Sequence, residues 1–169
     1  MGEFSRQLRK ELLPDEKDLF PPAAKSKESS TRALDHYPSP VLLERAAYLR
    51  KLAKLGDGSA SDPLKEYPQH STMLSVRVRS GIAELHEDFA DLFFVLEGRA
   101  TMVTGGTVAD PETVAPGEIR GSSVMGGNRQ ELRPGDVAHV AAGTPHQMLL
   151  AGDKTLTCLV VKIRENQRD

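Results

Sequence analysis

The sequence contains very little cysteine, with Cys158 as the single example among 169 residues. One thiol excludes an intrachain disulfide and is compatible with a reducing compartment. Cys158 lies in the apolar run Thr155–Val161, so we expect it to be buried in the core rather than reactive. The chain also lacks a Cys-x-x-Cys pair, a His-Glu-x-x-His motif and a Gly-x-Ser-x-Gly elbow. These absences remove the usual local signatures of zinc, thiol and serine sites.

Long apolar runs and an excess of basic residues are missing too. No stretch of about 18 apolar residues occurs, so no membrane partner is expected. The chain has 22 basic and 24 acidic residues and a net charge of −2, whereas nucleic-acid-binding proteins usually have a basic excess or a basic face. No nucleic-acid partner is therefore expected. Residues 1–6 are polar and lack the apolar segment of a secretory signal, which predicts a cytoplasmic protein. A leader missing from this chain is the open alternative.

The N-terminal part of the chain differs from the rest. Prolines and a polar run in residues 1–38 predict a flexible arm, which is either a disordered tail or an arm that wraps a partner subunit. Residues 39–66 are expected to form an amphipathic helix that ends at Gly56, followed by a turn-rich linker. The helix is predicted because apolar residues recur at helical spacing. These residues are Leu42, Ala46, Leu49 and Ala53.

From residue 67 onward, the periodicity is that of β-strands. Turn signals rich in glycine and proline separate the short apolar runs. After an alternating stretch that starts near Thr72, strands are predicted at Ile82–His86, Asp91–Glu97, Ala100–Thr104, Thr107–Ala109, Ile119–Arg120, Arg129–Leu132, Val137–Ala141, His146–Leu150 and Thr155–Ile163. Many short strands at this spacing indicate an all-β sandwich or barrel. We assign it to residues 67–164, with a tail at residues 165–169.

The first stretch with candidate functional residues runs from Gly81 to Gly98. Glu84 and His86 are two residues apart on one strand, so their side chains point to the same face. Asp91 opens the next strand after a short turn. If these two strands pair as a hairpin, Asp91 faces the same cavity as Glu84 and His86.

The second stretch runs from Pro134 to Met148. A turn at Gly143–Pro145 places His146 at the start of a strand, and Met148 shares its face. An imidazole with apolar neighbours on its own face is either a core histidine or a metal ligand. His139 lies on the preceding strand and is expected to be structural.

These two stretches resemble the paired motifs of the cupin superfamily, of the small single-domain kind with one conserved barrel. The first cupin motif contains a His-x-His pair, a glutamate and a closing glycine. Glu84, His86 and Asp91 stand at the two histidine places and the glutamate place, ahead of Gly98. In the second motif Gly135, Gly143 and His146 match. Ala141 and Leu150 replace the family's proline and asparagine.

The resemblance implies an all-β fold, namely the RmlC-like double-stranded β-helix or jelly-roll barrel, with an N-terminal helical segment. It also implies one divalent transition metal (Mn, Fe, Ni or Zn), where the usual ligands are three histidines and one glutamate. The matching set here is Glu84, His86, Asp91 and His146. The extra carboxylate is expected to lower the Lewis acidity of the metal. Asp91 is shorter than glutamate and either binds the metal or accepts a hydrogen bond from His86. A cupin that has lost its metal is the alternative.

The resulting functional prediction is a metal-dependent enzyme that acts on a small organic molecule inside the barrel, as a dioxygenase, lyase or isomerase. Glu84 or Asp91, if uncoordinated, would be the catalytic base. The alternative is a non-catalytic barrel that binds a small molecule. Arg77 and Arg79 either recognise a carboxylate substrate or form a solvated strand face.

The long segment between the two motifs and the N-terminal elements bear on the oligomeric state. The insertion Thr101–Leu132 is expected to be a lid over the barrel mouth or a dimer contact. The family resemblance and the N-terminal elements favour a homodimer.

Overall fold

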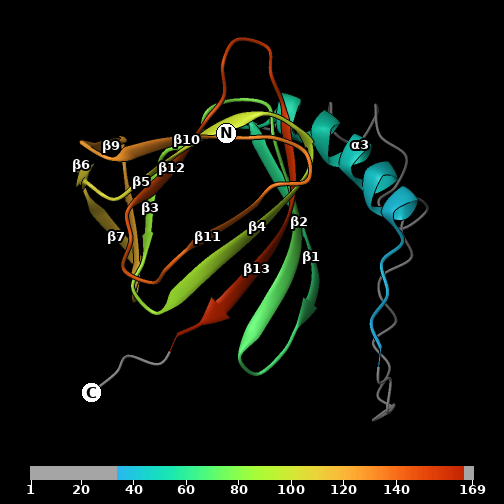
Figure 1. Cartoon of the computed structure of the whole chain (residues 1–169), viewed down its shortest axis with the longest axis horizontal. Coiled ribbons are helices and arrows are strands. Elements are labelled where there is room, and N and C mark those ends of the chain that lie inside the picture. The colour runs from blue at the N-terminus through green and yellow to red at the C-terminus, as the bar shows by residue number, and fades with distance from the viewer. Residues whose placement is uncertain (1–33, 166–169) are drawn as a thin grey trace, which may run out of the picture. The chain divides into compact units, whose positions relative to one another are not determined.

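The computed structural model describes residues 34–165 (Figure 1). The expectations for most of the arm and for the end of the tail fall on residues 1–33 and 166–169 and lie outside the described residues. From Tyr37 onward the described residues belong to one compact unit. They form one α-helix, α3 (Ser39–Leu55), and the strands β1 (Ser59–Glu66), β2 (His70–Arg77), β3 (Ala83–His86), β4 (Phe89–Gly98), β5 (Ala100–Thr104), β6 (Thr107–Ala109), β7 (Glu112–Ala115), β8 (Glu118–Gly121), β9 (Ser123–Met125), β10 (Asn128–Leu132), β11 (Val137–Val140), β12 (His146–Leu149) and β13 (Leu156–Arg164).

Two antiparallel sheets make up the barrel. The first has the order β1-β2-β13-β4-β11 and the second the order β10-β5-β12-β3-β8-β7, while β6 and β9 pair separately. Successive strands β2, β3, β4 and β5 alternate between the two sheets, which lie on opposite sides of the barrel (Figure 1). This arrangement confirms the predicted all-β jelly-roll barrel with an N-terminal helix. No helix in the part of the chain that the structure describes is long and apolar enough to span a membrane.

The predicted amphipathic helix packs on the outer face of the first sheet. Leu42, Ala46 and Leu49 of α3 form one buried cluster with Leu74 and Val76 of β2. Because side chains alternate along a strand, the opposite face of β2 points into the barrel. That inner face carries Met73, Ser75 and Arg77, which line the internal cavity. The helix therefore covers the apolar face of β2 and leaves its more polar face for the interior.

Residues 59–66 form a strand, where the sequence predicted a turn-rich linker. They form β1, an edge strand paired antiparallel with β2. The segment has the composition of a turn, but its position beside β2 and under α3 overrides local preference. Pro63 is tolerated because β1 is at the edge of the sheet, and the pairing register shifts between Pro63 and Lys65.

The first two motif strands do not pair as a hairpin, which was the condition considered for bringing Asp91 to the cavity. β3 pairs with β12 and β8 in the second sheet, whereas β4 pairs with β13 and β11 in the first. The two strands therefore face each other across the barrel. Asp91 on β4 approaches the cavity from the wall opposite Glu84 and His86.

The insertion Thr101–Leu132 is largely strand. It contains most of β5 and all of β6 to β10. β8 joins the second sheet directly beside β3, and β10 pairs with β5 at the other end of that sheet. β5, β7, β8 and β10 build barrel wall, whereas β6 and β9 pair separately, so both the lid and the dimer contact stay predictions.

The packing of α3 gives a first testable prediction. Leu49→Ala should destabilise the protein by about 2–5 kcal/mol, because it opens a cavity between the helix and the sheet. Leu55→Ala on the same helix is the matched control, since Leu55 is 55% exposed, and it should change stability by less than about 0.5 kcal/mol. Urea denaturation of both variants measures the difference. Equal effects would show that α3 does not pack as described.

Cys158 gives a second prediction. It is buried in the main core cluster, as expected from the sequence, and burial raises the pKa of its thiol to about 12. We expect iodoacetamide at pH 8 to leave the folded protein unmodified and to alkylate Cys158 in urea. Intact mass spectrometry measures this, and rapid alkylation of the folded protein would contradict the burial of Cys158.

Candidate metal centre

A cavity of about 370 Å³ lies between the two sheets. Apart from Ser75 and Gln147, its lining divides into two kinds of side chain. The charged and imidazole groups are Arg77, Glu84, His86, Asp91, Glu118, Arg120, His146 and Lys162. The apolar groups are Met73, Phe93, Met102, Met148 and Val160. The structure therefore brings the four residues singled out in the sequence into one cavity of the size of a small-molecule pocket.

Strand register places the polar groups in rows. His146 at the start of β12 pairs with Glu84 on β3, and Glu84 in turn pairs with Arg120 on β8. His86 pairs with Glu118 on β8, and Asp91 on β4 pairs with Lys162 on β13. Directly opposite residues on one face of an antiparallel pair have neighbouring side chains. The site is therefore built from cross-strand pairs on both walls of the barrel.

The two histidines present the same ring nitrogen to the cavity. The Nδ1 of His86 lies 2.6 Å from the Oε2 of Glu118, and the Nδ1 of His146 lies 3.1 Å from the carbonyl oxygen of Thr144. A carboxylate and a carbonyl accept hydrogen bonds, so each Nδ1 carries the proton. In the neutral rings the lone pair is consequently on Nε2, which is the state that binds a metal.

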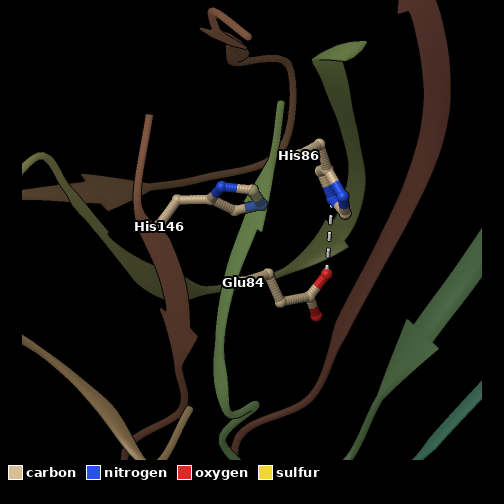
Figure 2. Close-up of side chains that lie close together, drawn as sticks. All are labelled: Glu84, His86 and His146. Carbon is tan, nitrogen blue, oxygen red and sulfur yellow. Dashed lines mark ion pairs between the residues drawn. The ribbon is translucent and has the colours of Figure 1, made fainter. Parts of the chain in front are cut away.

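Both Nε2 atoms converge on carboxylate oxygens. They lie 3.1 Å (His86) and 3.4 Å (His146) from the Oδ2 of Asp91. The Nε2 of His86 is also 3.6 Å from the Oε2 of Glu84, a contact drawn in Figure 2. One ligand atom from each of Glu84, His86 and His146 lies within 4.8 Å of the others. Asp91 belongs to the same cluster through its contacts with both rings.

The donor set fits a divalent metal. The lone pairs of neutral imidazoles and of carboxylate oxygens repel one another when they converge. Either a metal ion between them or protonation of the rings removes this repulsion. The second oxygen of Asp91, Oδ1, is buried and has no hydrogen-bond partner among the described residues. Two imidazole nitrogens with carboxylate oxygens suit Mn, Fe, Ni or Zn.

Neighbouring charges keep the two carboxylates ionised. Burial alone would raise the pKa of Asp91, but the hydrogen bonds that His146 and His86 donate when Nε2 carries a proton instead of a metal, together with the charge of Lys162, hold it well below its ordinary value. Burial would also raise the pKa of Glu84, yet Arg77, Arg120 and the two histidines lower it. Metal ligands have to be deprotonated, so both groups are in the form that a metal requires at neutral pH.

Three cations surround these acids. Arg77 on β2 reaches across the barrel and donates to Glu84 at 2.9 Å. Arg120 lies 3.0 Å from Glu118 and 3.8 Å from Glu84. The Nζ of Lys162 lies 3.5 Å from the Oδ1 of Asp91 and 3.9 Å from Glu118. The extra carboxylate was expected to lower the Lewis acidity of a bound metal, and these three positive charges would offset that effect.

Sequence reasoning treated Arg77 and Arg79 alike, and it missed other residues of the cavity. Arg77 lines the cavity, whereas Arg79 is exposed. His139 is exposed and lies 3.9 Å from Glu165, outside the cavity lining. Glu118, Arg120 and Lys162 were missed. Glu118 and Arg120 share a strand face, which is a signal, but they lie in an insertion that was expected to be a lid or a dimer contact.

Comparisons with known proteins agree with this architecture. Residues 113–162 match the cupin domain family. The match includes Glu118, Arg120, His146 and Lys162 and begins after the first motif. The TT1209 protein from Thermus thermophilus has a similar structure, with a TM-score of 0.51, 18% identity, and coverage of 73% of this chain and 95% of its own. At that identity the likeness shows the fold alone.

Two further solved structures are more distant. A protein with a double-stranded β-helix domain from Klebsiella pneumoniae has a TM-score of 0.48 at 15% identity, with 66% of this chain and 81% of its own covered. The DMSP lyase DddQ from Ruegeria pomeroyi has a TM-score of 0.47 at 16% identity, with 67% and 50% covered. Likeness at this level says nothing about function. No curated protein matches the chain in sequence.

The contact between Glu118 and His86 predicts how metal affinity responds to substitution. Glu118→Gln should weaken Zn²⁺ binding about 10–100-fold, because the ring of His86 loses the charged acceptor that fixes its tautomer. Glu87→Gln is the control, since Glu87 neighbours His86 in sequence but is exposed. Competition with a chromophoric chelator measures both affinities. An unchanged affinity in Glu118→Gln would show that this contact does not orient a ligand.

Proposed function

We propose that this chain, which matches the cupin domain family over residues 113–162, binds one divalent transition metal inside the barrel and uses it to convert a small organic molecule. The proposed ligands are Glu84, His86, Asp91 and His146. The observation that carries the proposal is the orientation of the two imidazoles. Each Nδ1 is held by an acceptor outside the cluster, and each Nε2 faces ionised carboxylates inside a cavity of about 370 Å³.

A bound metal would polarise an oxygen-bearing substrate or activate oxygen or water, which are the reactions of dioxygenases, lyases and isomerases. His86 and His146 would fix the metal. Glu84 and Asp91 are better suited to metal binding than to proton abstraction, because the lowered pKa of each makes it a weak base. Met73, Met102 and Met148 would hold the apolar part of the substrate and exclude water.

A non-catalytic ligand-binding barrel is the second candidate. One observation favours it: the acids of the cavity already have cationic partners within the chain, with Arg77 on Glu84 at 2.9 Å and Arg120 on Glu118 at 3.0 Å. Such a site is electrically balanced without a metal. Metal content therefore separates the two candidates.

A cytoplasmic location and a homodimer stay predictions. The buried face of α3 is occupied by the sheet of the same chain. A partner subunit would therefore contact the outer face of the helix, which includes the exposed Val41.

Metal analysis tests the proposal directly. After reconstitution with Mn²⁺, Fe²⁺, Ni²⁺ or Zn²⁺ and removal of free metal, we expect close to one equivalent of at least one metal by mass spectrometry. His86→Ala and His146→Ala should each retain less than about a tenth of it, because a lost imidazole removes a direct ligand. His139→Ala is the matched control and should retain the full amount, since His139 is exposed and outside the cavity.

Circular dichroism of the same samples separates loss of a ligand from loss of the fold. Less than a tenth of an equivalent in the folded wild-type protein, with every metal tried, would refute the metal site and favour the non-catalytic candidate. Equal retention by the His86 and His139 variants would place any bound metal elsewhere.

A further inference from the structure

We propose that the substrate of this site is a small carboxylate with an apolar body, whose carboxylate binds beside the metal against Arg77, Arg120 and Lys162. The inference rests on the proposed metal site and names the class of molecule that this site takes. It comes from the charges of the whole cavity rather than from the ligand set.

The first argument is the charge that the cavity would hold with a metal. Glu84, Asp91 and Glu118 contribute three negative charges, and Arg77, Arg120 and Lys162 contribute three positive ones. With neutral histidines these charges cancel. A divalent ion would then leave two positive charges among partly buried side chains, where charge–charge energies are larger than in bulk water. An anionic ligand at the metal offsets that excess, whereas a neutral ligand leaves it.

The second argument is an unfilled hydrogen-bond donor. The Nζ of Lys162 is buried and makes no hydrogen bond to any residue that the structure describes. Its closest acids lie at 3.5 Å and 3.9 Å, which are ion-pair distances. An ammonium group has three N–H donors, and a buried donor without an acceptor is costly. A carboxylate oxygen of a ligand in the cavity would accept from it.

The third argument concerns the position of the two arginines. Arg77 and Arg120 approach different oxygens of the Glu84 carboxylate, Oε1 at 2.9 Å and Oε2 at 3.8 Å. Glu84 is also a proposed metal ligand. Both guanidinium groups are therefore held next to the metal position, and guanidinium groups bind carboxylates through paired N–H donors.

The apolar side chains of the cavity indicate what the rest of the ligand is like. Met73, Phe93, Met102, Met148 and Val160 are apolar and line the same cavity. The cavity volume of about 370 Å³ is at the low end for ligand pockets. The ligand therefore has a charged end at the metal and a short apolar body.

The experiment compares carboxylates with neutral molecules of the same shape. Calorimetry on the Zn²⁺-loaded protein measures binding of benzoate against benzamide and of butyrate against butyramide, with zinc content measured in every sample. We expect at least one carboxylate to bind at least tenfold more tightly than its amide. Lys162→Met and Arg120→Met should each reduce that preference at least fivefold and leave the zinc content unchanged.

Arg77→Met and Arg79→Met form a matched pair. The two arginines lie two residues apart, but only Arg77 lines the cavity. Arg77→Met should reduce the preference for carboxylates, and Arg79→Met should not. Thermal unfolding of each variant identifies any that fail to fold, and the other two cavity variants then carry the comparison.

The outcomes separate this inference from the proposed function. Zinc at one equivalent with equal binding of carboxylates and amides would overturn the inference and leave the metal site standing. If the cavity variants lose zinc and carboxylate binding together, Arg77, Arg120 and Lys162 only maintain the shape of the metal site. That result would also overturn the inference. Failure of the wild-type protein to bind any metal would refute the proposed function and this inference with it.

Discussion

The contacts that span the cavity determine most of what this barrel can do. Asp91 reaches from the first sheet to the imidazoles of His86 and His146 on the second, and Arg77 reaches across to Glu84. Burying charges costs several kcal/mol for each ion unless partners compensate it. Each acid of the cavity has such a partner, and removal of one would leave its partner buried and uncompensated. The polar interior is therefore a connected network and not a set of independent residues.

The hydrophobic core is divided between the outer face of the first sheet and the barrel interior, where part of it lines the same cavity as the network. One apolar cluster packs α3 against the outer face of β2, and a second includes Val95, Met102 and Leu156 within the barrel. The alternation of side chains along β2 sends Leu74 and Val76 to the helix and Ser75 and Arg77 to the cavity. α3 thus stabilises the sheet from outside, and the inner face of β2 is free to carry polar groups.

The cavity also shows why a ligand set alone is a poor guide to the charge of a site. Two imidazoles and two carboxylates suggest a metal with reduced Lewis acidity. Arg77, Arg120 and Lys162 restore the positive charge from a greater distance, and Glu118 orients His86. Electrostatic interactions in a low-dielectric interior extend beyond the first contact, so these residues belong to the chemistry of the site as much as the ligands do.

The sequence by itself determined the features that depend on local pattern. Period-two alternation and turn glycines predicted an all-β sandwich or barrel, apolar spacing predicted α3, and the resemblance to the cupin motifs singled out Glu84, His86, Asp91 and His146. Pairing of distant strands was decided only by the tertiary structure. It turned residues 59–66 from an expected linker into β1, placed β3 and β4 on opposite walls, and brought Glu118 and Lys162 beside His86 and Asp91. Spacing along one strand fixes which face a side chain takes, but the residue opposite it depends on the register with another strand, and no local pattern encodes that register.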